Sequence, residues 1–224
     1  MAALVPRVVT EDLGKIFEKA ICLLYGTVYD GHYRYSLESA THLQTRLARL
    51  PTICPALTHT AKGGGVYDFT GRHDSTFHLS AKTTKRDGKI APQLVGQAQP
   101  AAFCQRVGIP EMSVPELKCY IQEHITTILP ILEQNTFSCP TIYYNQATNR
   151  CCYIKQKTPI DWASQAFIWT KPHAVWANSS TLKIGSTGIL EVQFHSASRS
   201  NMAVRWCFEK LLSTFAANFE ITEL

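Results

Sequence analysis

The sequence predicts a protein of the α/β (α+β) class, and three observations support this class. Apolar residues recur at helical spacing in the first half, a stretch near residue 75 alternates with the period of a strand, and the second half is rich in short strand patterns. The 224 residues are 45% hydrophobic, which suffices for one sizeable core. We therefore expect one domain, residues 1–224, with a helix-containing part at 1–135 and a strand-rich half at 136–224.

The strongest helix pattern lies near the N-terminus, between the N-cap candidate Thr10 and the stop signal Gly26. Its apolar positions follow helical spacing: Leu13, Ile16, Phe17, Ala20, Ile21 and Leu24. Glu18 lies beside this stripe. It is either a boundary residue with its tip in water or an acid that leans over the next part of the chain.

The other elements follow from caps, prolines and alternation. Further helices are expected at 36–50, with Leu37 inward, at 92–107, continuing past Pro100, and at 113–130, where Pro130 kinks or ends the helix. Short strands are expected at 53–58, 141–144, 152–155, 166–169, 182–184, 189–194 and 202–208.

The stretch 65–85 predicts a hairpin of two short strands with chemistry on one face. If the turn is centred on Asp74, an antiparallel register sets Asp68 opposite Ser80, and Lys82 lies two residues further on the same face. A carboxylate can hold a divalent metal through oxygen. A lysine beside it can orient water and steady a phosphate, a combination that suits metal-assisted phosphodiester hydrolysis.

These residues carry a resemblance to a known family. Asp68, thirteen residues and then Lys82 in the form x-Ala-Lys resemble the signature of the PD-(D/E)XK nucleases, and the surroundings are most similar to type II restriction endonucleases. Two positions depart from the pattern, because Tyr67 stands in place of the proline and Ser80 in place of the second acid. The resemblance implies a central mixed β-sheet flanked by helices, with an added C-terminal β-hairpin region.

The same resemblance implies roles for the residues. Asp68, the backbone carbonyl of Ala81 and an early-helix acid, here Glu18, would hold Mg²⁺, while Lys82 would position the attacking water. Ser80 would help through its hydroxyl or a bound water. The products would carry a 5′-phosphate and a 3′-hydroxyl, and a palindromic site would favour a two-fold symmetric homodimer.

Two further regions are candidates for contact with double-stranded DNA. After the strand that carries Lys82, a basic loop holds Lys85, Arg86 and Lys89, and Gln93 follows on the next helix. The alternative for this loop is a solvated turn without DNA contact. The last hairpin, 189–208, presents donor-rich side chains, and a two-stranded ribbon fits the major groove. The alternative is an ordinary sheet edge with a polar face. The residues concerned are Gln193, His195, Arg199, Asn201 and Arg205.

Composition narrows the remaining classes. A net charge of +5 is compatible with a nucleic-acid partner without requiring one. No export signal and no apolar run near the ~20 residues of a membrane span are visible, so we expect a cytoplasmic, bacterial protein without a membrane partner. The eight cysteines contain no Cys-x-x-Cys pair, which favours reduced, mostly buried thiols over a zinc site.

The leading hypothesis is a Mg²⁺-dependent type II restriction endonuclease. One alternative is another nuclease of the same superfamily, from repair or a mobile element, and a second is a DNA-binding module whose nuclease site has decayed at Ser80. A cysteine hydrolase lacks a recognisable Cys/His signature, and a serine hydrolase lacks a Gly-x-Ser-x-Gly elbow.

Overall fold

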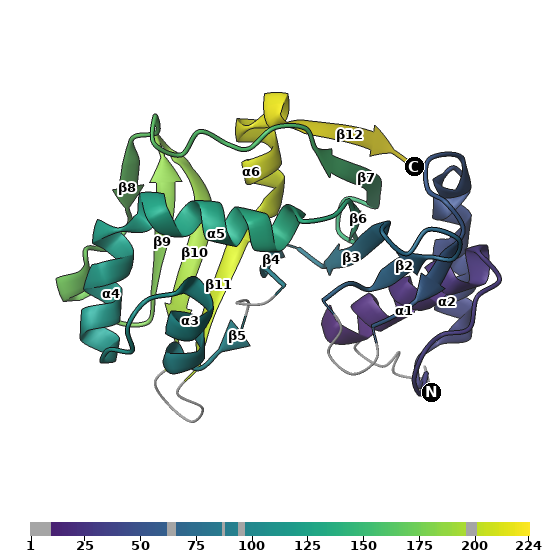
Figure 1. Cartoon of the computed structure of the whole chain (residues 1–224), viewed down its shortest axis with the longest axis horizontal. Coiled ribbons are helices and arrows are strands. Elements are labelled where there is room, and N and C mark those ends of the chain that lie inside the picture. Colours follow the sequence, from purple (N-terminus) through teal and green to yellow (C-terminus); the bar gives the residue numbers. More distant parts are fainter. Residues whose placement is uncertain (1–9, 62–65, 87, 94–96, 196–200) are drawn as a thin grey trace, which may run out of the picture. The chain divides into compact units, whose positions relative to one another are not determined.

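The chain forms two compact units in a computed structural model (Figure 1). The structure describes every residue except 1–9, 62–65, 87, 94–96 and 196–200. Unit 1 comprises Met1–Arg86, Cys139–Lys155 and Ile221–Leu224, and unit 2 comprises Asp87–Ser138 and Gln156–Glu220. The units interleave along the sequence, so their borders differ from the expected division at residue 135.

Unit 1 is a mixed α/β structure. Its helices are α1 (Thr10–Leu24) and α2 (Leu37–Gln44), followed by short 3₁₀ turns at Thr45–Leu47 and Leu50–Thr52. Its sheet runs in the order β1-β2-β3-β6-β7-β12. The strands are β1 (Leu57–His59), β2 (Phe69–Gly71), β3 (His78–Thr84), β6 (Thr141–Asn145), β7 (Arg150–Gln156) and β12 (Phe219–Glu223).

The sheet of unit 1 is mixed because one of its pairings is parallel. β1, β2 and β3 form an antiparallel meander, β3 pairs with β6 in parallel, and β6 returns as the antiparallel hairpin partner of β7. A parallel pair needs a long crossover connection, here the segment between Thr84 and Thr141, whereas the antiparallel pairs need only short turns. The expected mixed sheet with flanking helices is therefore present.

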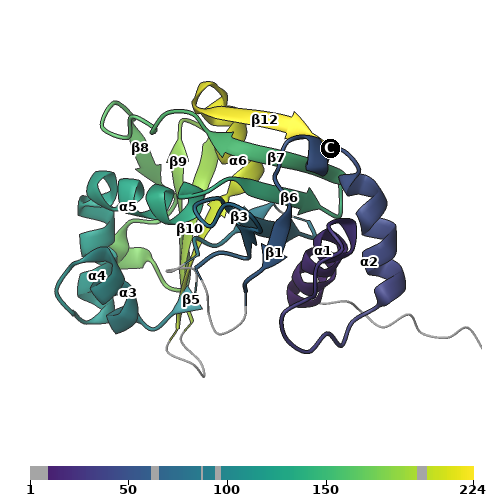
Figure 2. The same ribbon diagram turned by 45° about the vertical axis from the view of Figure 1, so that its right-hand side comes forward.

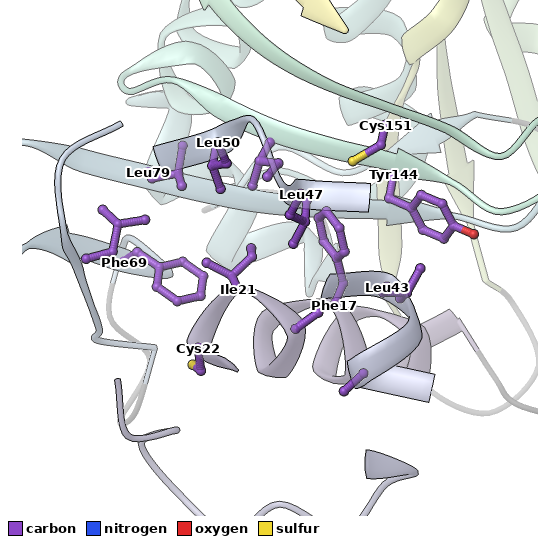
Figure 3. Packing of buried hydrophobic residues seen from close by; sticks show 14 of the residues in the cluster. Phe17, Ile21, Cys22, Leu43, Leu47, Leu50, Phe69, Leu79, Tyr144 and Cys151 are labelled. Carbon is purple, nitrogen blue, oxygen red and sulfur yellow. The ribbon is translucent and has the colours of Figure 1, made fainter. Parts of the chain in front are cut away.

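The core of unit 1 forms between α1 and one face of this sheet. Phe17 and Ile21 of α1 are fully buried and pack in one cluster with Phe69 and Leu79 of the central strands (Figure 3). Figure 2 shows α1 and α2 running next to one another at the edge of the unit. Gly14 of α1 faces β3, where a Cβ would make an ordinary contact with Thr83 Oγ1 at 3.7 Å. The expected helical stripe is thus the sheet-facing side of α1.

Unit 2 is built on an antiparallel sheet in the order β4-β11-β10-β9-β8, and β5 also pairs with β11. Its helices are α3 (Pro100–Val107), α4 (Val114–Glu123), α5 (Ile125–Phe137) and α6 (Phe208–Thr214), with 3₁₀ turns at His173–Val175 and Ala216–Asn218. Its strands are β4 (Lys89–Ile90), β5 (Gln97–Ala98), β8 (Phe167–Trp169), β9 (Ser179–Ile184), β10 (Thr187–Phe194) and β11 (Met202–Cys207).

Alternation gives this second sheet one apolar face. Leu190 and Val192 of β10 and Val204 and Trp206 of β11 are buried, as period-2 patterning requires. The indole N–H of Trp206 donates to Thr136 Oγ1 of α5 at 2.7 Å, so the largest buried side chain keeps its hydrogen bond. The expected hairpin at 189–208 is confirmed, and its opposite face holds the polar residues.

The expected helix at 92–107 is wrong in its first half. Residues Lys89–Ile90 and Gln97–Ala98 are strands that pair with β11, and Gln93 lies in a turn instead of on a helix. The helix begins at Pro100, whose fixed φ and missing N–H suit a first helical turn. Pairing with β11 overrides the weak local helix pattern, and Lys89 is consequently a strand residue and not a loop residue.

Two other helices differ from expectation in their extent. α2 ends at Gln44, and Leu37, expected to point inward, is 55% exposed at its N-terminus, although Ser36 caps it by accepting the Ser39 N–H at 3.1 Å. The helix at 113–130 breaks at His124 instead of Pro130. Pro130 falls inside α5, where its missing N–H removes one i→i−4 hydrogen bond of the helix.

Within the described ranges, no helix has both the length and the apolar character needed to cross a membrane.

Candidate active site

The hairpin of β2 and β3 has the register that the sequence predicted. Phe69 pairs with Leu79, and extending this register by one residue sets Asp68 opposite Ser80. The turn is centred on Asp74, whose Oδ1 accepts the backbone N–H of Thr76 at 2.9 Å. This tight turn fixes which residues of the two strands face one another.

Four of the expected residues come together at this hairpin, namely Asp68, Ser80, Ala81 and Lys82. Asp68 Oδ2 accepts hydrogen bonds from the backbone N–H of Ala81 at 2.7 Å and from the Ser80 hydroxyl at 3.1 Å. The same oxygen lies 3.9 Å from Lys82 Nζ. Ser80 is fully buried, whereas the side chains of Asp68 and Lys82 keep about a fifth of their surface exposed, at 22% and 20%. The carboxylate is therefore held through Oδ2 by two hydrogen bonds, while about a fifth of the side chain stays exposed.

The donor set can accommodate a hard divalent cation. No described residue donates a hydrogen bond to Asp68 Oδ1, so this oxygen remains open to a ligand. In an extended strand the N–H and C=O of one residue point to the same edge, so the carbonyl of Ala81 faces the side of Asp68. Mg²⁺ usually keeps several waters and binds through one or two carboxylates together with substrate phosphates. Asp68 and Ala81 fit such a partly hydrated ion.

The described residues provide no stronger metal site. They contain no group of three or more His, Cys, Asp or Glu side chains that could hold an ion. At this hairpin the neighbour of Asp68 across the strands is the neutral Ser80, whose hydroxyl donates to Asp68 Oδ2. Any ion here would rely on one carboxylate, backbone oxygen, water and its substrate.

Glu18 is held in a separate network on α1. Its carboxylate lies 3.1 Å from Lys15 Nζ, accepts from the Tyr29 hydroxyl at 3.4 Å and contacts His59 Nε2 at 3.2 Å. His59 Nδ1 accepts the backbone N–H of Asp30 at 2.9 Å, so the ring proton resides on Nε2 and is donated to Glu18. Burial raises the pKa of Glu18, but the His59 hydrogen bond and the Lys15 charge outweigh it, and the pKa is lowered overall.

This network lies on the helix-facing side of the sheet. His59 pairs with Phe69, and their rings are 5.0 Å apart on the face that packs against α1. Asp68 precedes Phe69 and bonds to Ser80, which alternates with the core residue Leu79. Among the described residues, the contacts of Glu18 include neither Asp68 nor Lys82. A metal role for Glu18 therefore remains a prediction that this arrangement does not favour.

His78 was not among the residues proposed from the sequence, although its alternation with Ser80 and Lys82 indicated that it lies on their face of the strand. It pairs with Thr70 across the hairpin, and its Nδ1 lies 3.4 Å from Thr70 Oγ1. Its ring stacks on Tyr67 with centroids 4.0 Å apart and an interplanar angle of 8°. An imidazole thus lies on the same strand face as the Asp68–Lys82 pair.

The cysteines are free thiols, as expected. Burial raises the pKa of four of them to about 12, namely Cys22, Cys54, Cys139 and Cys151. Cys139 lies near the hairpin, where the charge of Asp68 adds to the effect of burial. These four thiols are protonated at neutral pH and are poor nucleophiles, which does not favour the cysteine-hydrolase alternative.

The polar face of the β10–β11 hairpin holds two of the expected DNA-contacting residues and an acid. Arg205 Nη1 donates to Gln193 Oε1 at 3.3 Å, and it lies 3.7 Å from Glu191 Oε2. Lys89 Nζ of β4 donates to Glu191 Oε1 at 3.2 Å. The face expected to be donor-rich therefore carries a carboxylate between two cations.

The other expected DNA contacts lie in the segments that follow β3 and β10. His195 is exposed at the end of β10, and its backbone N–H donates to the carbonyl of Asn201 at 2.8 Å. Lys85 is half-buried and Arg86 is exposed in the bend that follows β3. Arg199 lies outside the described residues.

Comparison with known proteins finds similarity to a type II restriction enzyme, at 42% identity over 219 residues. This relative is the type II restriction enzyme CviAII of Paramecium bursaria Chlorella virus 1, and the match covers 96% of this chain and 63% of that protein. The chain thus spans less than two thirds of the length of this curated relative. No family model matches the chain, and no solved structure matches it.

Proposed function

We propose that the protein is a Mg²⁺-dependent type II restriction endonuclease of the PD-(D/E)XK superfamily. The observation that best supports this proposal is the 42% identity, across 96% of this chain, to a type II restriction enzyme. The hairpin supports the superfamily, because Asp68, directly before β2, and Lys82 of the neighbouring strand β3 bring their charged groups to 3.9 Å in a mixed sheet. The substrate would be double-stranded DNA with a short specific sequence.

The residues of the hairpin divide the work of phosphodiester hydrolysis. The Ala81 N–H and the Ser80 hydroxyl fix one oxygen of Asp68, which leaves Oδ1 and the Ala81 carbonyl for the ion. When bound, Mg²⁺ would neutralise charge on the phosphate and activate water. Lys82 would hold the attacking water, whose oxygen bonds to phosphorus as the bond to the 3′-oxygen breaks. The attacking water would give up one proton and the 3′-oxygen would take one, so the products are a 3′-hydroxyl and a 5′-phosphate.

Recognition of the DNA sequence would depend on basic and polar side chains outside the β2–β3 hairpin. Gln193 and Arg205 lie on one sheet face, where amide and guanidinium groups can reach base edges or phosphates. Lys85, Arg86 and the exposed His195 would add contacts to the backbone. A palindromic site would be read by a two-fold symmetric homodimer, since such a site repeats each contact.

Cleavage of long, sequence-diverse DNA tests the proposal. Wild-type protein should give discrete fragments with Mg²⁺ and none with EDTA, and Lys82→Ala should give none under either condition. Lys155→Ala is the matched control, because Lys155 is an exposed lysine of β7 outside the hairpin, and it should cut like wild type. Undiminished cutting by Lys82→Ala would refute the site. A Mg²⁺-dependent smear would favour a repair or mobile-element nuclease.

One observation favours a second candidate, a non-catalytic DNA-binding module. Ser80 replaces the second acid, and the described residues offer no three-ligand metal group. Sequence-specific DNA binding without cutting, across pH and with Mn²⁺ in place of Mg²⁺, would support this candidate against the nuclease.

A further inference from the structure

Glu191 occupies the centre of a charged cluster on the polar face of the second sheet. It stands directly opposite Arg205 in the β10–β11 register, while Lys89 reaches it from β4 on the other side of β11. The two carboxylate oxygens are divided between the cations, with Oε1 3.2 Å from Lys89 Nζ and Oε2 3.7 Å from Arg205 Nη1. The carboxylate of Glu191 thus pairs with two cations.

The exposure of the three side chains shows that the cluster is accessible from solvent. Lys89 and Arg205 retain 32% and 29% of their side-chain surface, whereas Glu191 retains 15%. Partly exposed ion pairs contribute little to folding stability. The consequence of Glu191 is therefore mainly electrostatic: two cations present a net charge of one to any approaching polyanion.

We infer that Glu191 is a specificity-determining residue that weakens binding to DNA of the wrong sequence. The inference rests on the proposed function. It adds a residue that repels DNA to a sheet face whose other polar side chains attract it. Lys89 and Arg205 provide the attraction, and Glu191 offsets part of it before any base is read.

The reason lies in how the two binding modes use charge. Non-specific binding is almost wholly electrostatic, so an opposing carboxylate weakens the whole interaction. Specific binding adds hydrogen bonds to base edges, here from groups such as Gln193 and Arg205. A phosphate does not offer the same pattern of donors and acceptors as a base edge. Discrimination is a difference of two affinities, so Glu191 increases it only by opposing the non-specific complex, in which Lys89 and Arg205 both face phosphates, more than the specific complex, in which Arg205 faces a base edge.

The expected size follows from counterion release. Each additional phosphate contact steepens the dependence of log K on log salt by about 0.9. Glu191→Gln frees one net positive charge, so binding to a random-sequence duplex should strengthen about eightfold at ~0.1 M salt. Lys89→Gln leaves Glu191 to neutralise Arg205 and should flatten the slope by about one.

The test measures binding of the full chain to a short random-sequence duplex, in EDTA and across a salt series. The matched control is Glu223→Gln, which removes the same charge from an ion pair with Arg150 in unit 1, where Nη2 and Oε1 are 2.8 Å apart. Glu191→Gln should steepen the slope while Glu223→Gln does not. Equal changes in the two variants, or no change in Glu191→Gln, would overturn the inference.

A second arm uses a duplex that carries the site mapped by cleavage. Glu191→Gln should strengthen binding to this duplex less than to the random one, so the ratio of affinities falls. If it instead loses affinity only for the site duplex, Glu191 accepts a hydrogen bond from a base and the repulsive role is refuted. Cleavage by wild-type protein tests the nuclease separately, so loss of either conclusion leaves the other open to measurement.

Discussion

Replacing Asp68 in two ways separates its structural role from its chemical one. The side chain accepts a hydrogen bond from the Ala81 N–H at 2.7 Å and from the Ser80 hydroxyl at 3.1 Å, so it joins the start of β2 to the centre of β3. Asp68→Asn keeps an acceptor of the same shape for the Ala81 N–H. Asp68→Ala removes that acceptor. Both remove the negative charge that faces Lys82 and the proposed ion.

The magnitudes follow from these contacts. Leaving the Ala81 N–H without its partner costs about 1–3 kcal/mol, and the partly exposed pair with Lys82 contributes roughly 0–1 kcal/mol. Asp68→Ala should therefore lower stability by about 2 kcal/mol, and Asp68→Asn by less than about 1 kcal/mol. At roughly 2–4 °C per kcal/mol for a chain of this size, the alanine variant should melt about 3–6 °C below the asparagine variant.

The assay combines thermal melting with DNA cleavage in Mg²⁺. Both variants should lose cleavage, and only the alanine variant should lose substantial stability. Retained cleavage by Asp68→Asn would remove Asp68 from the site. Equal melting temperatures for the two variants would show that the Ala81 hydrogen bond does not stabilise the hairpin, which refutes the structural half of the reasoning.

Two further predictions concern the surroundings of the hairpin. Burial raises the pKa of Glu18, but His59 and Lys15 outweigh burial and lower the pKa in the folded state. The ionised carboxylate therefore stabilises the fold above the ordinary pKa of 4.5, and this stabilisation is lost as the pH falls through the lowered pKa. Glu18→Gln should cost about 1 kcal/mol in chemical denaturation at pH 7 and less near pH 3. Gly71→Ala should destabilise by about 1–3 kcal/mol, since its Cβ would lie 2.4 Å from the Asp74 carbonyl oxygen, and should also reduce cleavage.

Each of these predictions can be contradicted by one result. A pH-independent cost for Glu18→Gln would contradict the ionised, hydrogen-bonded carboxylate. Gly14→Ala is the counterpart of Gly71→Ala, because its Cβ would meet Thr83 Oγ1 at 3.7 Å, an ordinary contact. It should be neutral or stabilise α1 by up to about 1 kcal/mol. A Gly71→Ala variant as stable as Gly14→Ala would show that the turn at Asp74 can relax.

Local patterns predicted the elements whose determinants are local. The Asp74 turn and the alternation around Leu79 fixed the hairpin register, so the juxtaposition of Asp68, Ser80 and Lys82 could be read directly. The β10–β11 hairpin was likewise readable from alternation. In each case a short turn and a period of two leave one register in which the apolar face is buried.

Patterns failed where distant partners decide the outcome. Residues 97 and 98 carry a weak helical pattern but form β5, because Met202 and Ala203 of β11 offer backbone partners. Neither Glu191 as a shared partner of two cations nor the His59 hydrogen bond to Glu18 has a sequence signal. Glu18 and His59 are 41 residues apart along the chain, Lys89 and Glu191 are 102 residues apart, and only folding sets such distances.

By itself the sequence determined the α/β class, the two hairpins and the face of β3 that carries Lys82, because propensity, turn chemistry and alternation act over a few residues. The tertiary structure alone decided that Glu18 faces His59 on the helix side of the sheet and that Glu191 divides its carboxylate between Lys89 and Arg205. The physical reason is that burial and charge pairing depend on which strands become neighbours, and that choice minimises the free energy of the whole chain and not of any one segment.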